Sequence, residues 1–590
     1  MKENKYCVNL YTPEGERLSA DAGRVPWDVY PRPHMQRDSF FCLNGEWEFS
    51  VTSRTEPPRY TEKIRVPFVP ESLLSDICRT VPSDVRLCYR REFSLPDGFL
   101  NSRALLHVGA ADQIAEVFLN GERLAVHRGG YESFSVDITS AVRPKNVLEI
   151  FVTDELSKLV LPYGKQCEKR GGMWYTPISG IWQTVWIESV PDVYISEISV
   201  VSDCVGADIN VTMSDGSECD GEMILHLPSG DTVTKLSSGR GRIEPSEPLL
   251  WTPESPHLYR ITVRAKEDEV RSYFALRTID VRQVGDAARL CLNGKPYFFH
   301  GLLDQGYFSD GIFLPAEPEG YTRDILAAKK FGFNMLRKHI KTEPEIFYYE
   351  CDRLGMAVFQ DMVNNGKYSF IRDTALPTVG FKRRDDRRMH RDAEAREEFL
   401  RGMESTVKRL AFHPSVCVWT IFNEGWGQFD HAAAYKRLKA IDATRPVDSV
   451  SGWFLPPRGK ELLSDFDSSH VYFKPIKLTA SEKPSFLSEF GGYSYKIEGH
   501  SFNLKNNYGY SSYSSQREFE DALERLYIEQ VVPAVREGLC AAVYTQLTDV
   551  EDETNGLLTY DRRVEKADVS RLLAISDALK AAFIDACKSK

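Results

Sequence analysis

The sequence predicts a multidomain β plus α/β fold, in which two all-β domains precede a barrel of alternating strands and helices. The chain has 590 residues, which is enough for about three or four domains. Short strands separated by turn signals fill the first half of the chain, whereas apolar strands alternate with helical periods in the second half. Aromatic residues make up 12% of the sequence, which suits β-rich domains and sites that stack on flat ligands.

Residues 1–190 are predicted to form a β-sandwich or a jelly roll. Strand candidates such as SRALLHV, IAEVFL and NVLEIFVTD are separated by turn signals. Asn120 and Gly121 stand between VFL and RLAV, where an Asn-Gly pair is a strong signal for a β-hairpin. Short strands at this spacing are typical of both all-β architectures.

Residues 191–285 are predicted to form an immunoglobulin-like β-sandwich. The segments DVYISEISVVS, ADINVTM and HLYRITVRAKEDEVRSYFAL each have the pattern of a strand or a strand pair. Roughly 90 residues of all-β sequence match the size of this domain type.

Residues 286–590 are predicted to form a (β/α)8 barrel, or TIM barrel. The strand candidates lie at 298–304, 334–340, 356–362, 416–424, 447–453, 467–473, 485–490 and 542–549. Helical periods fill most of the intervals, and in one of them Phe399, Met403, Val407 and Leu410 recur on one face. The interval between the fifth and sixth strands has no clear helix. Eight strands alternating with helices over about 300 residues nevertheless fit this barrel.

The composition argues against several classes of protein. The 74 basic and 85 acidic residues give a net charge of −11, so non-specific binding to nucleic acid is not expected. The sequence has no run of about 18 apolar residues for a membrane span and no apolar run of a signal peptide, so we expect a cytoplasmic protein. The twelve cysteines have no CxxC or zinc-type spacing. Free thiols, no metal and no cofactor are therefore predicted.

The active site of such a barrel lies at the carboxyl ends of its strands. Two glutamates stand out there, because Glu424 closes the apolar run VCVWTIFNE and Glu489 closes PSFLSE. Desolvation at such positions makes the pKa of a carboxyl group easy to tune. Hydrolysis of a glycoside requires two facing carboxylates, one to give a proton to the leaving oxygen and one to attack the anomeric carbon. Glu424 and Glu489 are therefore the predicted catalytic pair.

Several motifs resemble glycoside hydrolase family 2, the family of β-galactosidases, β-glucuronidases and β-mannosidases. WTIFNEGWGQ resembles the acid/base motif of the family, and FLSEFGG resembles its nucleophile motif. GGMWYTPISGIWQTVWIE is similar to the end of its N-terminal sugar-binding domain, and FNMLRKHIKTEPEIFYYECDRLGM is similar to its second barrel strand and the following helix. The order of jelly roll, immunoglobulin-like sandwich and barrel also agrees, so the resemblance covers nearly the whole chain.

The resemblance implies a role for each residue of the site. Glu424 would be the general acid/base and Glu489 the nucleophile. Asn423 would hydrogen-bond the sugar 2-hydroxyl, and Arg337 would keep Glu489 ionised and oriented. The division of labour is physically sensible, because the nucleophile must start charged and the acid must start protonated. The further substrate-binding candidates at the strand ends, each of which could instead serve barrel packing or a neighbouring hydrogen bond, are His339, Asp304, Trp453, His470 and Tyr472.

Departures from the family pattern bear on the substrate. Gly172 stands where many members place an aspartate that reaches the active site, which puts contact with the far hydroxyls of the sugar in doubt. The family's second-strand histidine aligns with Ile340, and His339, one place earlier, would point to the opposite face of a regular strand. Thr545 stands at the position of the tryptophan that is common at the end of the eighth strand.

Another departure concerns charged sugars. Bacterial glucuronidases carry an Asn-x-Lys pair shortly before a GxxTxDR run, whereas here GLLTYDR (556–562) follows Glu553-Thr554-Asn555. The lysine is missing and an acid stands nearby, so we predict that a uronate is repelled. The acidic run from 549 to 553 is interpreted as a solvated loop, because it lacks the spacing of an EF-hand calcium site.

The sequence therefore predicts an exo-acting retaining β-glycosidase that hydrolyses terminal neutral β-glycosides by double displacement, with a β-galactoside favoured. One alternative is a transglycosylase, or a glycosidase for an unusual sugar such as an arabinopyranoside or a galactofuranoside. Another is a non-catalytic carbohydrate-binding relative, which predicts loss of one catalytic carboxylate, although both are present. The expected partner is an oligosaccharide or glycoside substrate, without nucleic acid or membrane, and a homo-oligomer is compatible with the sequence.

Overall fold

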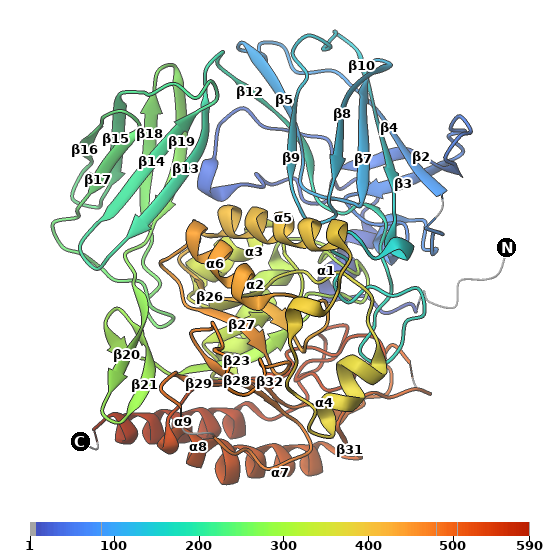
Figure 1. The fold of residues 1–590 in the computed structure, drawn as a ribbon. Helices are drawn as coiled ribbons and strands as arrows, with labels where there is room; N and C mark the ends of the chain where they lie inside the picture. The colour runs from blue at the N-terminus through green and yellow to red at the C-terminus, as the bar shows by residue number, and fades with distance from the viewer. Residues whose placement is uncertain (1–7, 84, 479–480, 504, 589–590) are drawn as a thin grey trace.

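Two β domains lie side by side against one side of a barrel (Figure 1). The structure is a computed structural model that describes residues 8–83, 85–478, 481–503 and 505–588, so Cys7 lies outside it. The predicted class, a multidomain β plus α/β protein with a TIM barrel, is confirmed.

The N-terminal β domain consists of two main antiparallel sheets. The four-stranded sheet has the order β1 (Phe41–Cys42), β12 (Val185–Val190), β5 (Arg103–Val108) and β9 (Phe134–Asp137). The six-stranded sheet has the order β3 (Glu62–Val66), β2 (Gly45–Ser53), β4 (Val85–Phe93), β10 (Asn146–Thr153), β7 (Ile114–Leu119) and β8 (Glu122–Arg128). A short ladder joins β6 (Ala111–Asp112) to β11 (Gly180–Ile181). Apolar residues of both main sheets, among them Trp47, form the core between them.

The predicted hairpin at Asn120 and Gly121 is confirmed. Leu119 pairs with Glu122 across it, so the turn has two residues. Asn120 and Gly121 have φ values of 54° and 85°, the left-handed conformations that such a turn requires.

The second β domain is a sandwich of a three-stranded and a four-stranded sheet. The first sheet has the order β13 (Ile195–Ser202), β14 (Ala207–Met213) and β17 (Arg240–Ile243). The second has the order β16 (Thr232–Leu236), β15 (Gly221–His226), β18 (Tyr259–Ala265) and β19 (Asp268–Phe274). A separate small sheet follows, made of β20 (Ile279–Val284), β21 (Ala287–Leu292) and β22 (Lys295–Pro296). The limit predicted between residues 285 and 286 falls in the turn between β20 and β21.

Eight parallel strands form the nearly closed barrel. Their order in the sheet is β27 (Val447–Ser451), β26 (Val416–Asn423), β25 (Ala357–Asp361), β24 (Met335–Lys338), β23 (Phe299–Asp304), β32 (Leu539–Thr545), β29 (Ser485–Gly491) and β28 (Asp467–Val471). All eight predicted strands exist. The last one spans 539–545 rather than 542–549, so the residues after Thr545 belong to a loop.

Helices cover the outside of the barrel. They include α2 (Glu319–Lys330), α3 (Glu345–Leu354), α5 (Ala393–Leu410), α6 (His431–Ile441), α7 (Gln516–Leu526), the π-helix η6 (Tyr527–Val531), α8 (Val532–Glu537) and α9 (Val569–Lys588). Between β25 and β26 the chain also forms η4 (Phe370–Ala375), α4 (Leu376–Thr378) and η5 (Asp386–Arg388). Asp392 caps α5, whose predicted apolar face is buried. As the sequence suggested, no helix lies between β27 and β28 in the described residues.

The segment before the first strand packs on both the barrel and the jelly roll, where Asn44 donates its side-chain amide to the carbonyl of Pro26 at 3.1 Å. Its helix α1 (Pro13–Ala20) follows Thr12, whose hydroxyl donates to Asp310 at 2.6 Å. Trp27 donates its indole N–H to the carbonyl of Pro315 at 2.9 Å. The start of the chain therefore ties the jelly roll to the barrel.

Ten cysteines of the described residues are free thiols, as predicted. Cys78 corrects the expectation that all of them are free, because it is disulfide-bonded. None of the helices in the described part of the chain has the length and apolar character that a membrane crossing requires.

Candidate active site

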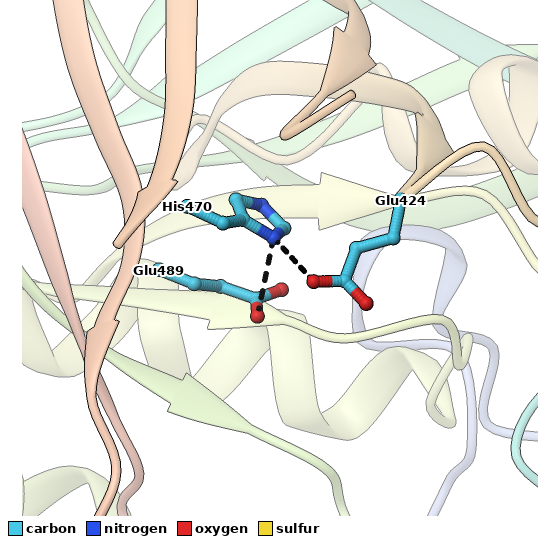
Figure 2. Close-up of side chains that lie close together, drawn as sticks. All are labelled: Glu424, His470 and Glu489. Atoms are coloured by element: carbon cyan, nitrogen blue, oxygen red, sulfur yellow. Dashed lines mark hydrogen bonds and ion pairs between the residues drawn. The ribbon is translucent and has the colours of Figure 1, made fainter. Parts of the chain in front are cut away.

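Glu424 and Glu489 face each other at the carboxyl end of the barrel (Figure 2). Glu489 belongs to β29, whereas Glu424 directly follows β26 and has a left-handed backbone with a φ of 52°. That conformation is uncommon for a residue with a side chain, so the local fold holds Glu424 in an unusual direction. One oxygen of each carboxylate and one ring nitrogen of His470 all lie within 4.8 Å of one another.

His470 bridges the two carboxylates (Figure 2). Its Nδ1 lies 2.8 Å from Glu424 Oε1 and 3.4 Å from Glu489 Oε2. Its Nε2 lies 3.4 Å from Arg337 Nη1, and because a guanidinium can only donate, Nε2 accepts and Nδ1 carries the proton. Burial lowers the pKa of His470 to about 3. The imidazole is therefore neutral and donates its N–H to Glu424.

Glu424 is placed to hold a proton. Burial raises the pKa of its carboxyl group, while the positive charges of Lys165, Arg337 and Lys382 partly offset this effect. The side chain is still 19% exposed, so a ligand can reach it. Because His470 donates to Oε1, the proton of the neutral acid belongs on Oε2.

Arg337 on β24 organises the other groups and is wholly buried. Its Nη1 donates to Glu489 Oε1 at 3.2 Å and to the carbonyl of Ser488 at 2.9 Å. Its Nη2 donates to Asn423 Oδ1 at 2.9 Å, and its Nε donates to Asp361 Oδ1 at 3.0 Å. Arg337 thus supplies a counter-charge to Glu489. It also occupies the amide oxygen of Asn423, which leaves the amide N–H groups as the donors for a ligand.

His339 faces the catalytic side, the same side as Arg337 two residues earlier, as strand alternation requires. The expectation that it points away, drawn from the family's histidine position at Ile340, is therefore wrong. The strand ends at Lys338 and Ile340 has a φ of 55°, so the regular alternation does not continue beyond His339. The Nδ1 of His339 lies 2.9 Å from Asp361 Oδ2 and 3.9 Å from Glu489 Oε1. Asp361 therefore holds both Arg337 and His339 in position beside Glu489.

Tyr472 and Trp453 also join the site. The hydroxyl of Tyr472 donates to Glu489 Oε2, and its ring stacks on Tyr510 at 3.6 Å between centroids. The ring of Trp453 lies 5.6 Å from that of His470 in an edge-to-face arrangement.

Asp304 does not join the two glutamates. Its Oδ2 pairs with Lys338 at 2.6 Å, and its Oδ1 accepts the backbone N–H of Gly306 at 2.9 Å. Lys338 points away from Arg337 along the same strand, as alternation requires. The structure therefore places Asp304 in a separate buried cluster.

Glu424, His470 and Glu489 also have the spacing of metal ligands, the only such cluster among the described residues. The ring nitrogen nearest both carboxylates is the Nδ1 of His470, which carries a proton. A protonated nitrogen cannot bind a metal. We therefore assign no metal to this cluster.

Lys165 reaches the site from the N-terminal domain and was missed in the sequence. Its charge acts on Glu424, His339 and Glu553. The described residues include no carboxylate in ion-pair contact with it. Barrel periodicity could not have found it, because it belongs to another domain; the one signal was a cation within the aromatic segment LPYGKQC.

The position of Gly172 is lined by a tyrosine. A Cβ on Gly172 would lie 3.3 Å from the ring of Tyr508, and the backbone φ is 61°. The N–H of Tyr508 donates to the carbonyl of Asp552 at 2.8 Å. A side chain at position 172 would therefore need the ring of Tyr508 to shift slightly.

The acidic run after the eighth strand is buried, which corrects its interpretation as a solvated loop. Asp549 pairs with Lys566 at 2.7 Å. Glu551 and Asp552 pair with Arg170 at 3.3 and 3.5 Å. Most of the run therefore joins the barrel to the N-terminal domain.

Glu553 lies within electrostatic reach of Glu489, which raises the pKa of Glu553 in addition to the larger effect of burial. Its carboxylate accepts from the hydroxyl of Tyr175 and from the side-chain amide of Asn555 at 3.0 Å. Lys165 acts on it in the opposite direction. Buried Glu553 therefore lies within electrostatic reach of both Glu489 and Lys165.

Family comparisons agree with this architecture. Residues 283–490 match the model for the glycosyl hydrolases family 2 TIM barrel domain, and residues 62–168 match the glycosyl hydrolase 2 galactose-binding domain-like model. The fold and the paired carboxylates define a multidomain barrel protein of the glycoside hydrolase type. The chain belongs to glycoside hydrolase family 2.

Curated relatives are distant and longer. A β-galactosidase of Thermoanaerobacter pseudethanolicus is 24% identical over 388 residues, covering 61% of this chain and 48% of the relative. A β-glucuronidase of Felis catus is 25% identical over 405 residues, covering 62% of this chain and 59% of the relative. The chain thus spans about half the length of the relatives that it matches.

Solved structures share the fold over nearly the whole chain. A β-D-glucuronidase from Dictyoglomus thermophilum has a TM-score of 0.70 and 20% identity, covering 93% of this chain and 98% of that chain. A β-galacturonidase from Eisenbergiella tayi bound to galacturonate has a TM-score of 0.65 and 18% identity, covering 94% and 99%.

Proposed function

We propose that this protein is an exo-acting retaining β-glycosidase that releases a terminal neutral sugar, with a β-galactoside as the first candidate. The observation that carries the proposal is the pair Glu424 and Glu489, whose nearest oxygens lie within 4.8 Å. Retaining enzymes keep their carboxyl groups about 5–5.5 Å apart, whereas inverting enzymes leave about 6.5–9.5 Å for a water. The short separation supports direct attack by a carboxylate.

In the first step Glu489 attacks the anomeric carbon while the bond to the leaving oxygen breaks. Glu424 gives its proton to that oxygen, so the leaving group departs as a neutral alcohol. Arg337 and Tyr472 hold the oxygens of Glu489 in position for the attack. Arg337 holds the amide oxygen of Asn423, so the amide N–H groups are the donors that would bind a sugar hydroxyl.

In the second step Glu424, now a carboxylate, takes a proton from water. The water attacks the anomeric carbon, and the bond to Glu489 breaks to release the sugar. His470 supports both steps, because its neutral N–H donates to Glu424 and gains strength when Glu424 is charged.

The preference for a neutral sugar rests on Glu553. This buried carboxylate lies within electrostatic reach of Glu489, so a uronate bound between them would meet two negative charges. The same carboxylate can accept hydrogen bonds from neutral hydroxyl groups. Contacts such as Tyr175 to Glu553 and the N–H of Thr176 to Glu551 at 2.9 Å support a site closed on one side, as a terminal sugar requires.

Hydrolysis of a β-uronide is the second candidate, and Lys165 favours it. This cation acts on both Glu424 and Glu553 without an ion-pair partner among the described residues, so a sugar carboxylate could take that place. A β-glucuronidase and a β-galacturonidase are among the proteins of similar fold. Glu553 opposes this binding, and we place it second.

A panel of p-nitrophenyl β-glycosides tests the choice of sugar under one set of conditions. We expect the β-galactoside to have a higher kcat/KM than the β-glucuronide and the β-galacturonide. A faster uronide would overturn the proposal of a neutral sugar and favour the role of Lys165. Glu553→Gln then serves as a check, because it should reduce the difference in kcat/KM between the neutral and the charged glycosides.

Proton NMR of the early products tests the stereochemistry. We expect the β-anomer of the sugar to form first and then mutarotate. Initial formation of the α-anomer would exclude the retaining mechanism. Products with a new glycosidic bond would identify a transglycosylase instead.

A further inference from the structure

The mouth of the site carries aromatic side chains that solvent reaches. Phe381 is 65% exposed and Phe473 is 69% exposed, although large apolar side chains are usually buried. Phe473 packs edge-to-face on Tyr510 at 5.2 Å, and Tyr510 stacks on Tyr472. The rings of Tyr472, Tyr510 and Phe473 therefore extend from Glu489, which accepts from the Tyr472 hydroxyl, out to the surface.

Two lysines stand next to these exposed rings. Lys382 follows Phe381 and lies over the ring of Trp453 at 5.0 Å from its centroid. Trp453 in turn packs on His470, which donates to Glu424. Lys474 follows Phe473 and is exposed. Lys382 therefore lies on the side of the acid/base residue.

The two lysines act on each other as like charges. They come from different loops, after β25 and after β28, and the charge of Lys474 adds to burial in lowering the pKa of Lys382. Neither has an ion-pair partner in the part of the chain that the structure describes. Glu424 acts on Lys382 as an opposite charge but makes no ion pair with it, and a bound anion would relieve the remaining repulsion between the two lysines.

We infer that the leaving-group side of the site binds an aglycone with an aromatic or other apolar body and a carboxylate or sulfonate-type oxyanion. Glu424 protonates the leaving oxygen, so the surface beside Glu424 is where the aglycone must lie. The apolar body would contact Phe381 and Phe473, and the oxyanion would lie between Lys382 and Lys474. This inference rests on the proposed function, and it concerns the aglycone, whereas Glu553 concerns the released sugar.

Matched aryl β-galactosides test the inference. The probes are 4-carboxyphenyl β-galactoside, 4-sulfophenyl β-galactoside and the neutral 4-(methoxycarbonyl)phenyl β-galactoside. Neutral phenyl galactosides give a reference line of kcat/KM against the pKa of the leaving group, which corrects for leaving-group acidity. We expect the two anionic probes to exceed that line by about three- to tenfold in kcat/KM at low salt, the scale of one or two partly exposed ion pairs. The advantage should shrink as salt is added.

Variants assign the effect to the two lysines. In the double variant Lys382→Gln/Lys474→Gln, the ratio of anionic to neutral kcat/KM should fall to about 1. Lys477→Gln is the matched control, because Lys477 is an exposed lysine of the same loop, and it should keep the wild-type ratio. A ratio near 1 in the wild type, or an unchanged ratio in the double variant, would overturn the inference. A preference for only one anionic probe identifies which oxyanion is bound.

Failure of the proposed function gives a different result. If no galactoside is hydrolysed, the same aglycones are attached to the sugar that the panel identifies. Calorimetric binding to the Glu489→Gln variant makes the charge comparison independent of turnover. Equal affinity for the anionic and neutral probes in that variant would also contradict the inference.

Discussion

Two charged clusters on opposite faces of β24 show how the same residue types can serve structure or chemistry. Arg337 faces the end of the barrel that holds Glu424 and Glu489, whereas Lys338, the next residue, faces helix α3 and lies 4.3 Å from the ring of Phe347. The alternation of a strand separates the two environments by a single residue. The two clusters differ in how their charges balance.

The cluster around Lys338 is balanced. Lys338 and Lys341 both lie 2.9 Å from Glu343, and Lys338 also pairs with Asp304 at 2.6 Å. Two cations thus meet two carboxylates, and Tyr321 donates a further hydrogen bond to Glu343 at 2.7 Å. Buried charges need such complete pairing to be tolerated. Each of the two lysines therefore has a carboxylate in direct contact.

The catalytic cluster is not balanced. Arg337 is the cation in direct contact with Asp361 and Glu489, and His470 is neutral. Burial raises the pKa of Glu424, and the positive charges of Lys165, Arg337 and Lys382 offset that rise only in part, which favours the protonated form. The comparison teaches that direct pairing of charges separates the two clusters. Each buried charge around Lys338 has an oppositely charged partner in contact, whereas buried Glu424 has no lysine or arginine in ion-pair contact among the described residues.

The largest effect is expected for Glu489→Gln. The variant keeps the shape of the side chain but removes the attacking charge, so kcat should fall at least about 10³-fold, which is about 4 kcal/mol of barrier. Hydrolysis of p-nitrophenyl β-galactoside measures the loss, and thermal unfolding checks that the fold is retained. A rate within tenfold of the wild type would contradict the role of Glu489 as nucleophile.

Glu343→Gln should affect stability instead of chemistry. It removes one carboxylate from the balanced cluster and leaves Lys341 without its ion-pair partner, so the free energy of unfolding should fall by about 3 kcal/mol. Urea unfolding measures this loss, and kcat of the folded enzyme should change little. Glu46→Gln, in an exposed pair with Lys63, is the control and should cost less than about 1 kcal/mol. If both variants lose the same free energy of unfolding, the structural role of the cluster around Lys338 is contradicted.

Glu424→Ala should have an effect that depends on the leaving group. Aryl glycosides with acidic leaving groups need little proton assistance, so they should lose about tenfold, whereas alkyl glycosides should lose about 10²–10⁴-fold. Added azide should restore turnover and yield the β-glycosyl azide, which NMR identifies. The same loss for both kinds of substrate would argue against Glu424 as the acid/base.

The barrel and the close approach of Glu424 to Glu489 could be predicted from the sequence because both depend on local patterns. Glu424 and Glu489 each follow an unbroken apolar run, and strand ends meet at one edge of a barrel. Asp304 was expected among the substrate-binding residues, but it pairs with Lys338 on the other face of the neighbouring strand. The local sequence pattern does not reveal this pairing. His339 reaches the site because it follows Arg337 by two residues and so lies on the same face of the chain.

Contacts between domains could not be predicted from the sequence. Lys165 belongs to the N-terminal domain, and its approach to Glu424 depends on how that domain docks. The acidic run after the eighth strand has the composition of a solvated loop, yet Arg170 of the N-terminal domain pairs with it. Such pairs join residues hundreds of positions apart in the sequence, so local periodicity cannot predict them.

The smallest effect is expected for Lys165→Gln, and it concerns pH. Burial raises the pKa of Glu424 and the charge of Lys165 partly offsets that rise, so removing the charge should raise the pKa further. The acid form of Glu424 then persists to higher pH, and the basic limb of the kcat/KM profile should move upward by a few tenths of a pH unit, the scale of a partly screened charge. Lys169→Gln is the matched control, because Lys169 is an exposed lysine of the same loop. A downward shift, or the same shift in both variants, would show that Lys165 does not act on Glu424.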